Sequence, residues 1–271
     1  MSTAAPSRPS VAVLGVGTMG EAVLAGVLRS GCAPDDVVAV VRRDERAAEL
    51  ADRYGVRSVP LSEGAARDVL VVAVKPQQLD DLLASAAPHV RPGALVLSVA
   101  AGVPTARLAA ALPDGVAVVR AMPNTPALVG AGTTAVSAGP GADEERMALV
   151  GELLRGTGDV VVLPEALQDA ATAVSGSGPA YVLLLLESLV EAGVHAGLPR
   201  ATASRLATGT LAGTAALVRE SGEHPSLLRE RVTSPGGTTA AGLRRLEERG
   251  LRAALLDAVE AARDRARALG A

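Results

Sequence analysis

The chain has 271 residues, a length that allows one large domain or two modest ones. Its net charge is -3, from 26 Lys and Arg against 29 Asp and Glu, and this balance argues against a general nucleic-acid or membrane-surface binder. Aromatic residues make up only 1% of the chain, which excludes aromatic stacking on single-stranded nucleic acid as a mode of binding.

The N-terminal segment, the apolar runs and the single cysteine bear on the cellular location of the protein. Residues 1–10 are rich in Pro and Ser and lack the apolar core of a signal peptide, so we predict a flexible segment there. The longest apolar run, Ala180 to Leu186, is far shorter than the roughly 18 residues that a membrane span needs. Cys32 excludes an internal disulfide framework, and we favour a small buried side chain over a catalytic thiol. We therefore predict a cytoplasmic protein with no membrane or nucleic-acid partner.

The first 163 residues alternate short valine-rich runs with helical segments. We expect strands at 11–14, 37–41, 69–74, 94–99, 116–120, 133–137 and 160–163. We expect helices at 18–29, 44–54, 79–87 and 143–154. Short apolar runs without alternation, placed between helices, are typical of parallel strands buried on both faces. The pattern predicts a doubly wound α/β domain over residues 11–163.

The remaining residues, 164–271, predict an all-α domain. We expect helices at 165–196, 200–220, 226–231, 239–249 and 251–269, the first of them bent at Gly176, Gly178 and Pro179. These helices are crowded with Ala, Gly, Ser and Thr, which let helix backbones approach closely. We favour a dimer interface over a general excess of alanine as the reason.

A glycine-rich loop follows the first expected strand and opens the first expected helix. Its sequence G-V-G-T-M-G fits G-x-G-x-x-G, and the residues concerned are Gly15, Gly17, Thr18, Met19 and Gly20. Such glycines let a pyrophosphate approach backbone N–H groups at a helix N-terminus. The alternative is a strand-to-helix turn without a ligand. In this context we favour a dinucleotide.

The end of the second strand indicates which nucleotide binds. NAD sites usually place an Asp or Glu there, whereas this chain has Arg42 and Arg43, and Asp44 is expected to begin the next helix. Two guanidinium groups can bind a 2′-phosphate through charge-assisted hydrogen bonds. The alternative is a solvated arginine pair. We predict NADPH, with NADH as the second choice.

Later strands end in residues suited to the same ligand. The third is followed by Val74, Lys75 and Pro76, and Lys75 is the one lysine of the chain. Ligands of open α/β sheets bind at this carboxyl edge, so Lys75 is expected to contact the cofactor, although a surface position stays open. Small residues, Ala100 and Ala101, leave room at the next strand end. The following strand leads into the stiff loop R-A-M-P-N-T-P (120–126), whose alternative role is a structural turn.

Two motifs interrupt the helical half. The run S-G-S-G-P-A-Y (175–181) is unfavourable inside a helix and indicates close packing or a ligand. The run S-P-G-G-T-T (234–239) precedes a helix and suits a small carboxylate. Two roles, which can coexist, are open to the hydroxyl groups of Thr238 and Thr239: capping the helix and touching the substrate. The three histidines have no metal-ligand spacing, so we predict no metal and surface or capping roles for them.

The glycine-rich loop, V-K-P, R-x-M-P-N-T-P, S-G-S-G-P-A-Y and S-P-G-G-T-T-A-A-G-L (234–243) occur together and in this order. In this combination the chain resembles the pyrroline-5-carboxylate reductases. The resemblance implies an N-terminal Rossmann domain, a C-terminal helical dimerisation domain, and a homodimer. Dimers of this family often assemble further into decamers of five dimers, and the sequence leaves the choice between dimer and decamer open. The resemblance also implies hydride transfer from NAD(P)H to the C=N carbon of 1-pyrroline-5-carboxylate, which gives L-proline, the last step of proline biosynthesis.

The resemblance also assigns residues. It implies that Thr239 is the catalytic residue whose hydroxyl contacts the ring nitrogen. It places the substrate carboxylate on Ser234, Gly236, Gly237 and Thr238, in a loop that meets the cofactor domain of a partner subunit. Met19, Lys75, Pro76, Ala100 and Ala101 would line the cofactor. Two alternatives stay open, another imine or β-hydroxyacid reductase of the same architecture and a dinucleotide sensor without turnover.

Overall fold

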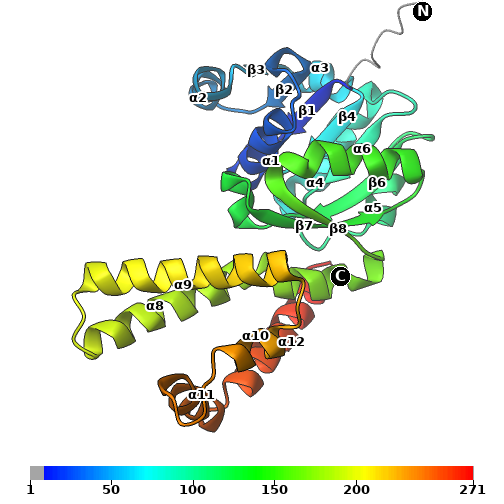
Figure 1. The fold of residues 1–271 in the computed structure, drawn as a ribbon. Coiled ribbons are helices and arrows are strands. Elements are labelled where there is room, and N and C mark those ends of the chain that lie inside the picture. The colour runs from blue at the N-terminus through cyan, green and yellow to red at the C-terminus, as the bar shows by residue number, and fades with distance from the viewer. Residues whose placement is uncertain (1–8, 271) are drawn as a thin grey trace, which may run out of the picture. The chain divides into compact units, whose positions relative to one another are not determined.

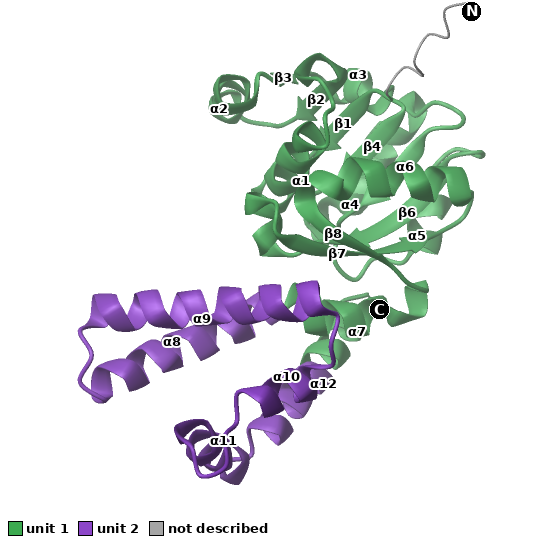
Figure 2. Cartoon of the chain, viewed as in Figure 1, with its two compact units in different colours: residues 1–177, 262–271 green, residues 178–261 purple. Residues whose placement is uncertain are grey.

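The computed structural model describes residues 9–270 and divides the chain into two compact units (Figure 2). The first unit comprises Met1–Ser177 and Ala262–Ala271, and the second comprises Gly178–Ala261. The unit that holds the sheet also includes α7 (Gln168–Ala171) and the last turns of α12 (Leu251–Gly270), so the two compact units do not divide at residues 163/164, and the domain boundary predicted there stays a prediction. Most of the predicted flexible segment 1–10 lies outside the described residues.

Within the described residues, an eight-stranded sheet forms the centre of the first unit (Figure 1). Its spatial order is β3 (Arg57–Ser58), β2 (Val37–Val40), β1 (Val11–Leu14), β4 (Val69–Val72), β5 (Leu95–Ser98), β6 (Ala117–Met122), β7 (Gly132–Ala138) and β8 (Gly158–Val162). The strands from β3 to β6 are parallel, as predicted for β2, β1, β4, β5 and β6, whereas the two-residue strand β3 was not predicted. The next pair, β6 and β7, is antiparallel. A parallel pair would need a crossover helix between its strands, and the connection over residues 123–131 is too short to contain one.

Both faces of the sheet are covered by apolar residues. Successive residues of each central strand enter opposite clusters, as Val13 and Leu14 of β1 show. Helices α1 (Thr18–Arg29), α2 (Asp44–Tyr54) and α6 (Glu144–Leu154) contribute to the first cluster. Helices α3 (Leu61–Ala65), α4 (Leu79–Ala86) and α5 (Thr105–Ala110) contribute to the second. Cys32 is 7% exposed and packs in the first cluster, which confirms its predicted role as a small core residue.

The second unit is helical, as predicted. It contains α8 (Gly178–His195), α9 (Arg200–Ser221), α10 (Pro225–Arg231), α11 (Thr238–Glu248) and the first part of α12. Figure 1 shows α8 and α9 side by side as an antiparallel hairpin. Small residues permit this approach, since a Cβ atom placed on Gly193 would lie 3.1 Å from the Cβ of Ala203. His224 caps α10 by accepting a hydrogen bond from the backbone N–H of Ser226 at 3.2 Å, one of its predicted roles.

A set of charged residues joins the first two helices of the sheet unit. The carboxylate of Glu21 in α1 pairs with Arg46 and with Arg53, both in α2, and it accepts a hydrogen bond from the hydroxyl group of Tyr54 at 2.8 Å. Burial raises the pKa of Glu21, but the hydrogen bonds and the two positive charges outweigh it and hold that pKa below its ordinary value. The ionised carboxylate therefore stabilises the packing of α2 on α1.

The Glu21→Gln variant should be less stable than the parent protein at neutral pH. A group whose pKa is lowered by folding stabilises the folded state above its unfolded pKa, about 4.3 for glutamate, and loses that contribution as the pH falls through the folded value. The difference in unfolding free energy between the two proteins should therefore shrink at acid pH, as measured by urea denaturation. Asp52→Asn is the control, because Asp52 lies in α2 without an ion pair among the described residues. A difference that does not change with pH would contradict the assignment.

Candidate functional site

Two glycines of the nucleotide loop are required by the fold itself. Gly15 has a φ of 86°, and a Cβ atom there would lie 2.6 Å from Cγ1 of Val74. At Gly20 a Cβ atom would lie 2.2 Å from the carbonyl oxygen of Gly15, so only glycine lets α1 start this close to the end of β1. These two residues would be glycines even in a turn that binds nothing.

Gly17 has no such reason to be glycine. Its φ is -83°, which any residue adopts, and a Cβ atom there would meet no described atom within 4 Å. The residue stands at the N-terminus of α1, where no side chain caps the free N–H groups. An outer ligand that approaches the backbone explains this glycine, and a phosphate group is the natural one at a helix N-terminus. This observation favours the dinucleotide over the ligand-free turn.

A cavity of about 690 Å³ opens beside this loop. It brings together five of the predicted cofactor residues, Gly15, Gly17, Arg42, Arg43 and Val74. Both arginines follow β2, are exposed, and make no ion pair with described residues, so their guanidinium groups are available to an anion. Asp44 begins α2, as expected, and does not line the cavity.

The other predicted cofactor residues do not line that cavity, namely Thr18, Met19, Gly20, Lys75, Pro76, Ala100 and Ala101. The side chain of Lys75 is exposed at the start of a 3-10 turn, Pro76–Gln78, and makes no ion pair with described residues. Ala100 is buried after β5. The predicted contact of Lys75 with the cofactor therefore stays a prediction.

Arg46 is a cavity residue that the sequence did not single out. Its Nε donates to the carbonyl oxygen of Val16 in the nucleotide loop at 3.1 Å, while its other nitrogens pair with Glu21 and Glu49. Burial lowers the pKa of Arg46, but the hydrogen bonds and charges of these two glutamates raise it overall. The contacts of Arg46 therefore hold the nucleotide loop in place, whereas Arg42 and Arg43 are available to a ligand.

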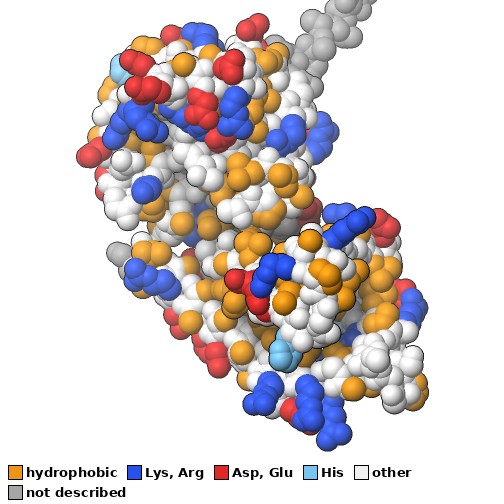
Figure 3. Space-filling view, turned by 90° about the vertical axis from the view of Figure 1, so that its left-hand side faces the viewer, with side chains coloured by type: hydrophobic (Ala, Val, Ile, Leu, Met, Phe, Trp, Pro, Cys, Tyr) orange, Lys and Arg blue, Asp and Glu red, His pale blue; other side chains and the backbone are white. Residues whose placement is uncertain are grey.

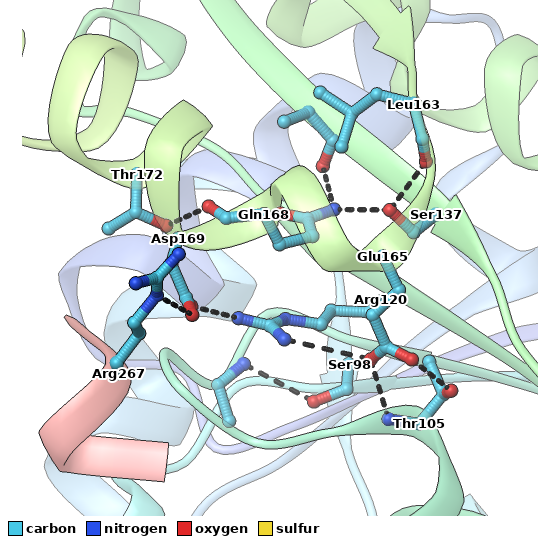
Figure 4. Close-up of polar contacts among 12 residues, drawn as sticks. Ser98, Thr105, Arg120, Ser137, Leu163, Glu165, Gln168, Asp169, Thr172 and Arg267 are labelled. Carbon is cyan, nitrogen blue, oxygen red and sulfur yellow. Dashed lines mark hydrogen bonds and ion pairs between the residues drawn. The ribbon is translucent and has the colours of Figure 1, made fainter. Parts of the chain in front are cut away.

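A cluster of charged residues surrounds the buried guanidinium group of Arg120 (Figure 4). Arg120 of β6 is 5% exposed and pairs with Glu165 at 3.6 Å and with Asp169 at 3.5 Å. Asp169 also lies 3.9 Å from Arg267, near the end of α12. Glu165 accepts hydrogen bonds from the backbone N–H and the hydroxyl group of Thr105, at 2.8 and 2.7 Å. The first residue of the R-x-M-P-N-T-P loop therefore anchors segments from far along the chain to the sheet.

The segment 234–239 lies in the helical unit, where residues 234–237 lie between α10 and α11 and Thr238 and Thr239 begin α11. Gly236 has a φ of 69°, and the backbone N–H of Gly237 closes a turn onto the carbonyl oxygen of Ser234 at 3.0 Å. Gly237 is the N-cap of α11, and no side chain caps it. The capping role expected for Thr238 and Thr239 is wrong, because both already lie in the first turn of the helix. Among the described residues their hydroxyl groups have no hydrogen-bond partner.

Comparison with known proteins explains why these two regions occur in one chain. Residues 165–269 match the family model for pyrroline-5-carboxylate reductase dimerisation, and residues 10–102 match that for NADP oxidoreductase, coenzyme F420-dependent. The pyrroline-5-carboxylate reductase of Synechocystis sp. is 46% identical over 262 residues, which cover 95% of this chain and 97% of that protein. The chain belongs to the pyrroline-5-carboxylate reductase family. The family member of Escherichia coli is 38% identical over 252 residues, which cover 92% of this chain and 94% of that protein.

Solved structures of pyrroline-5-carboxylate reductases share the fold. That of the Coxiella burnetii protein has a TM-score of 0.92 at 33% identity and covers 98% of this chain and 100% of its own. That of the Plasmodium falciparum protein, with NADP bound, has a TM-score of 0.86 at 29% identity and covers 97% of this chain and 99% of its own. These matches confirm the predicted fold class, a Rossmann-like domain followed by a helical dimerisation domain.

The Gly17→Ala variant should bind NADPH at least about tenfold more weakly, a loss of about 1.4 kcal/mol, because its methyl group takes the space through which a phosphate reaches the N–H groups. Its melting temperature should change little, since the methyl group would meet no atom of the described residues within 4 Å. Fluorescence titration and thermal denaturation measure the two quantities. Gly151→Ala, equally open but in α6, should bind NADPH like the parent protein. If Gly17→Ala lowered the melting temperature but not the affinity for NADPH, the nucleotide loop would have a purely structural role.

Proposed function

We propose that this chain reduces 1-pyrroline-5-carboxylate to L-proline, with NADPH as the preferred hydride donor. The observation that carries the proposal is the match to pyrroline-5-carboxylate reductases over nearly the whole chain, with both the nucleotide loop and the S-P-G-G-T-T loop intact. The reaction adds a hydride to the C=N carbon and a proton to the nitrogen, so it consumes one reduced cofactor for each proline formed.

The residues around the nucleotide loop fit NADP(H). Gly17 leaves the N-terminus of α1 open to a pyrophosphate, and Arg42 and Arg43 are free to bind a 2′-phosphate. In the same cavity, Glu21 and Glu49 balance the charge of Arg46, which holds the nucleotide loop. Arg42 and Arg43 are not needed for that task. When bound, the cofactor supplies the hydride.

The protein's part in the reaction is to position the substrate and hold a proton near its nitrogen. The N–H groups at the start of α11, with Ser234, Gly236, Gly237 and Thr238, form the proposed carboxylate site. The hydroxyl of Thr239, the next residue of the first turn, is the proposed contact of the ring nitrogen. A hydrogen bond there favours the protonated imine, which accepts a hydride more readily than the neutral one. No strong general base is required.

The homodimer is the proposed catalytic unit. Helix α8 carries several exposed leucines, among them Leu183, Leu184 and Leu189, which are 62%, 64% and 42% exposed. Hydrophobic side chains are prominent on the helical unit in the space-filling view (Figure 3).

Residues 165–195 are long and apolar enough for a membrane span by length and composition, but they lie within the part that matches the family dimerisation model. A second copy of the chain is therefore the proposed cover for this face. The decamer and the cytoplasmic location stay predictions.

The decisive assay adds 1-pyrroline-5-carboxylate to the protein at neutral pH and follows NADPH absorbance, with proline measured as product and NADH run in parallel. We expect rapid oxidation of NADPH. In the variant with both Arg42→Met and Arg43→Met, the ratio of kcat/KM for NADPH over NADH should fall by about tenfold or more, because charge-assisted hydrogen bonds to the phosphate are lost. Arg91→Met, a surface change outside the cavity, is the control. A folded protein that binds NADPH but forms no proline would reject the activity.

Replacement of Thr239 tests the hydrogen bond at the ring nitrogen. Thr239→Ala should lower kcat/KM for 1-pyrroline-5-carboxylate by about tenfold or more, while NADPH affinity stays the same. Thr239→Ser keeps the hydroxyl group and should retain most of the activity. Steady-state kinetics of both variants measure the effect. If Thr239→Ala stayed within about twofold of the parent protein, the proposed role would be refuted.

A further inference from the structure

Asn124 is the one asparagine in the 271 residues, and its side chain uses both its donor and its acceptor. It follows β6 in the R-x-M-P-N-T-P loop. Its Oδ1 accepts a hydrogen bond from the backbone N–H of Thr133 at 2.9 Å. Its Nδ2 lies 3.2 Å from the carbonyl oxygen of Ser175 and 3.3 Å from the Ser175 hydroxyl oxygen. That hydroxyl in turn donates to the carbonyl oxygen of Thr133 at 3.3 Å. The two conspicuous motifs without an assigned role are therefore joined through one amide.

The segment that Asn124 holds is unusual. Residues Thr172–Gly176 form a π-helical turn, closed by a hydrogen bond from the N–H of Ser177 to the carbonyl oxygen of Thr172 at 2.9 Å. In an α-helix the carbonyl group of Ser175 would accept from the N–H of residue 179, but residue 179 is proline and has none. The Nδ2 of Asn124 supplies a donor at this position. The sequence thus contains both the interruption and the side chain that compensates for it.

This turn lies against the carboxyl end of β6. A Cβ atom on Gly176 would come within 3.0 Å of the methyl carbon of Met122, so a glycine is needed for the approach. Strand β6 runs parallel to β5, with Arg120 opposite Ser98, so Met122 ends β6 at the edge where Ala100 and Ala101 follow β5. In open α/β sheets this is the ligand-binding edge, and π-helical turns occur frequently at functional sites.

We propose that Asn124 is a positioning residue for the reduction: its amide fixes the π-helical turn against the loop after β6, and this sets the wall of the site at the reacting end of the cofactor. The proposal rests on the proposed function. An amide suits the task because one short side chain must donate to one segment and accept from another. Arginine and lysine donate only, and a carboxylate accepts only.

The test is Asn124→Asp, which keeps the shape and the acceptor for Thr133 but places an oxygen opposite the carbonyl group of Ser175. We expect kcat to fall by about tenfold or more, because a small displacement of the site wall misaligns the reacting atoms. The KM for NADPH should stay within about twofold, since the nucleotide cavity is not lined by Asn124. Hydrogen exchange of the amides of residues 172–177 should become faster.

Two further variants keep the test informative. Ser175→Ala removes only the hydroxyl contacts and should give a smaller loss of kcat in the same direction, so a misfolded Asn124→Asp protein does not end the test. Arg146→Met removes a 2.8 Å hydrogen bond to the carbonyl oxygen of Gly93, which precedes β5 at the opposite edge of the sheet, and should leave both kcat and the exchange of 172–177 unchanged.

The measurements separate the possible outcomes. Faster exchange together with a lower kcat supports the proposal. Faster exchange with unchanged kcat would show a purely structural contact and overturn it, and unchanged exchange would overturn it whatever the activity. A parent protein that does not reduce 1-pyrroline-5-carboxylate would reject the proposed function instead, and the exchange data would still report whether Asn124 holds the turn.

Discussion

The arrangement of the sheet unit depends on the pairing of one buried guanidinium group. Arg120 lies within β6 with 5% of its surface exposed, and a charge in that position must be matched by carboxylates close by. Glu165 and Asp169 supply them, and Asp169 in turn faces Arg267 near the end of the chain. Removing one partner would leave an uncompensated charge, so this cluster holds the start and the end of the helical half on the sheet unit. The π-helical turn begins only three residues after Asp169.

The nucleotide site separates what folding requires from what a ligand requires. Gly15 and Gly20 are fixed by backbone geometry and close packing, whereas Gly17 is explained only by space for an incoming group. The arginines divide in the same way. Arg46 is held by Glu21, Glu49 and the carbonyl oxygen of Val16, and Arg42 and Arg43 make no ion pair with described residues. Because Arg46 pairs with Glu21 and Glu49, the negative charge of these two glutamates is neutralised near the place where a phosphate is expected to bind.

The sequence predicted most of the fold because its signals are local. Valine runs and helical periodicity located the strands β1, β2, β4 and β5 and the helices α1, α2 and α4 to within a few residues, but they did not indicate the short elements β3 and α3. The reversal of β7 was missed, since strand direction depends on the path of the loop and not on the strand residues. The partners of Arg120 and the role of Arg46 were missed because they are contacts between segments 30 or more residues apart. The sequence left a capping role for the threonines open, but Gly237 is the N-cap of α11, and the hydroxyl groups of Thr238 and Thr239 have no hydrogen-bond partner among the described residues.

A residue type that occurs once in the chain is conspicuous, but geometry must decide what that residue does. The chain has one lysine and one asparagine, and each stands next to a strand end at the carboxyl edge. Lys75 is exposed and makes no ion pair with described residues, so its position alone indicates no task within the subunit. Asn124 is half-buried and joins Thr133 to Ser175 through both ends of its amide. Asn124 is therefore explained by its contacts within the chain. No such contact explains Lys75, whose contact with the cofactor stays a prediction.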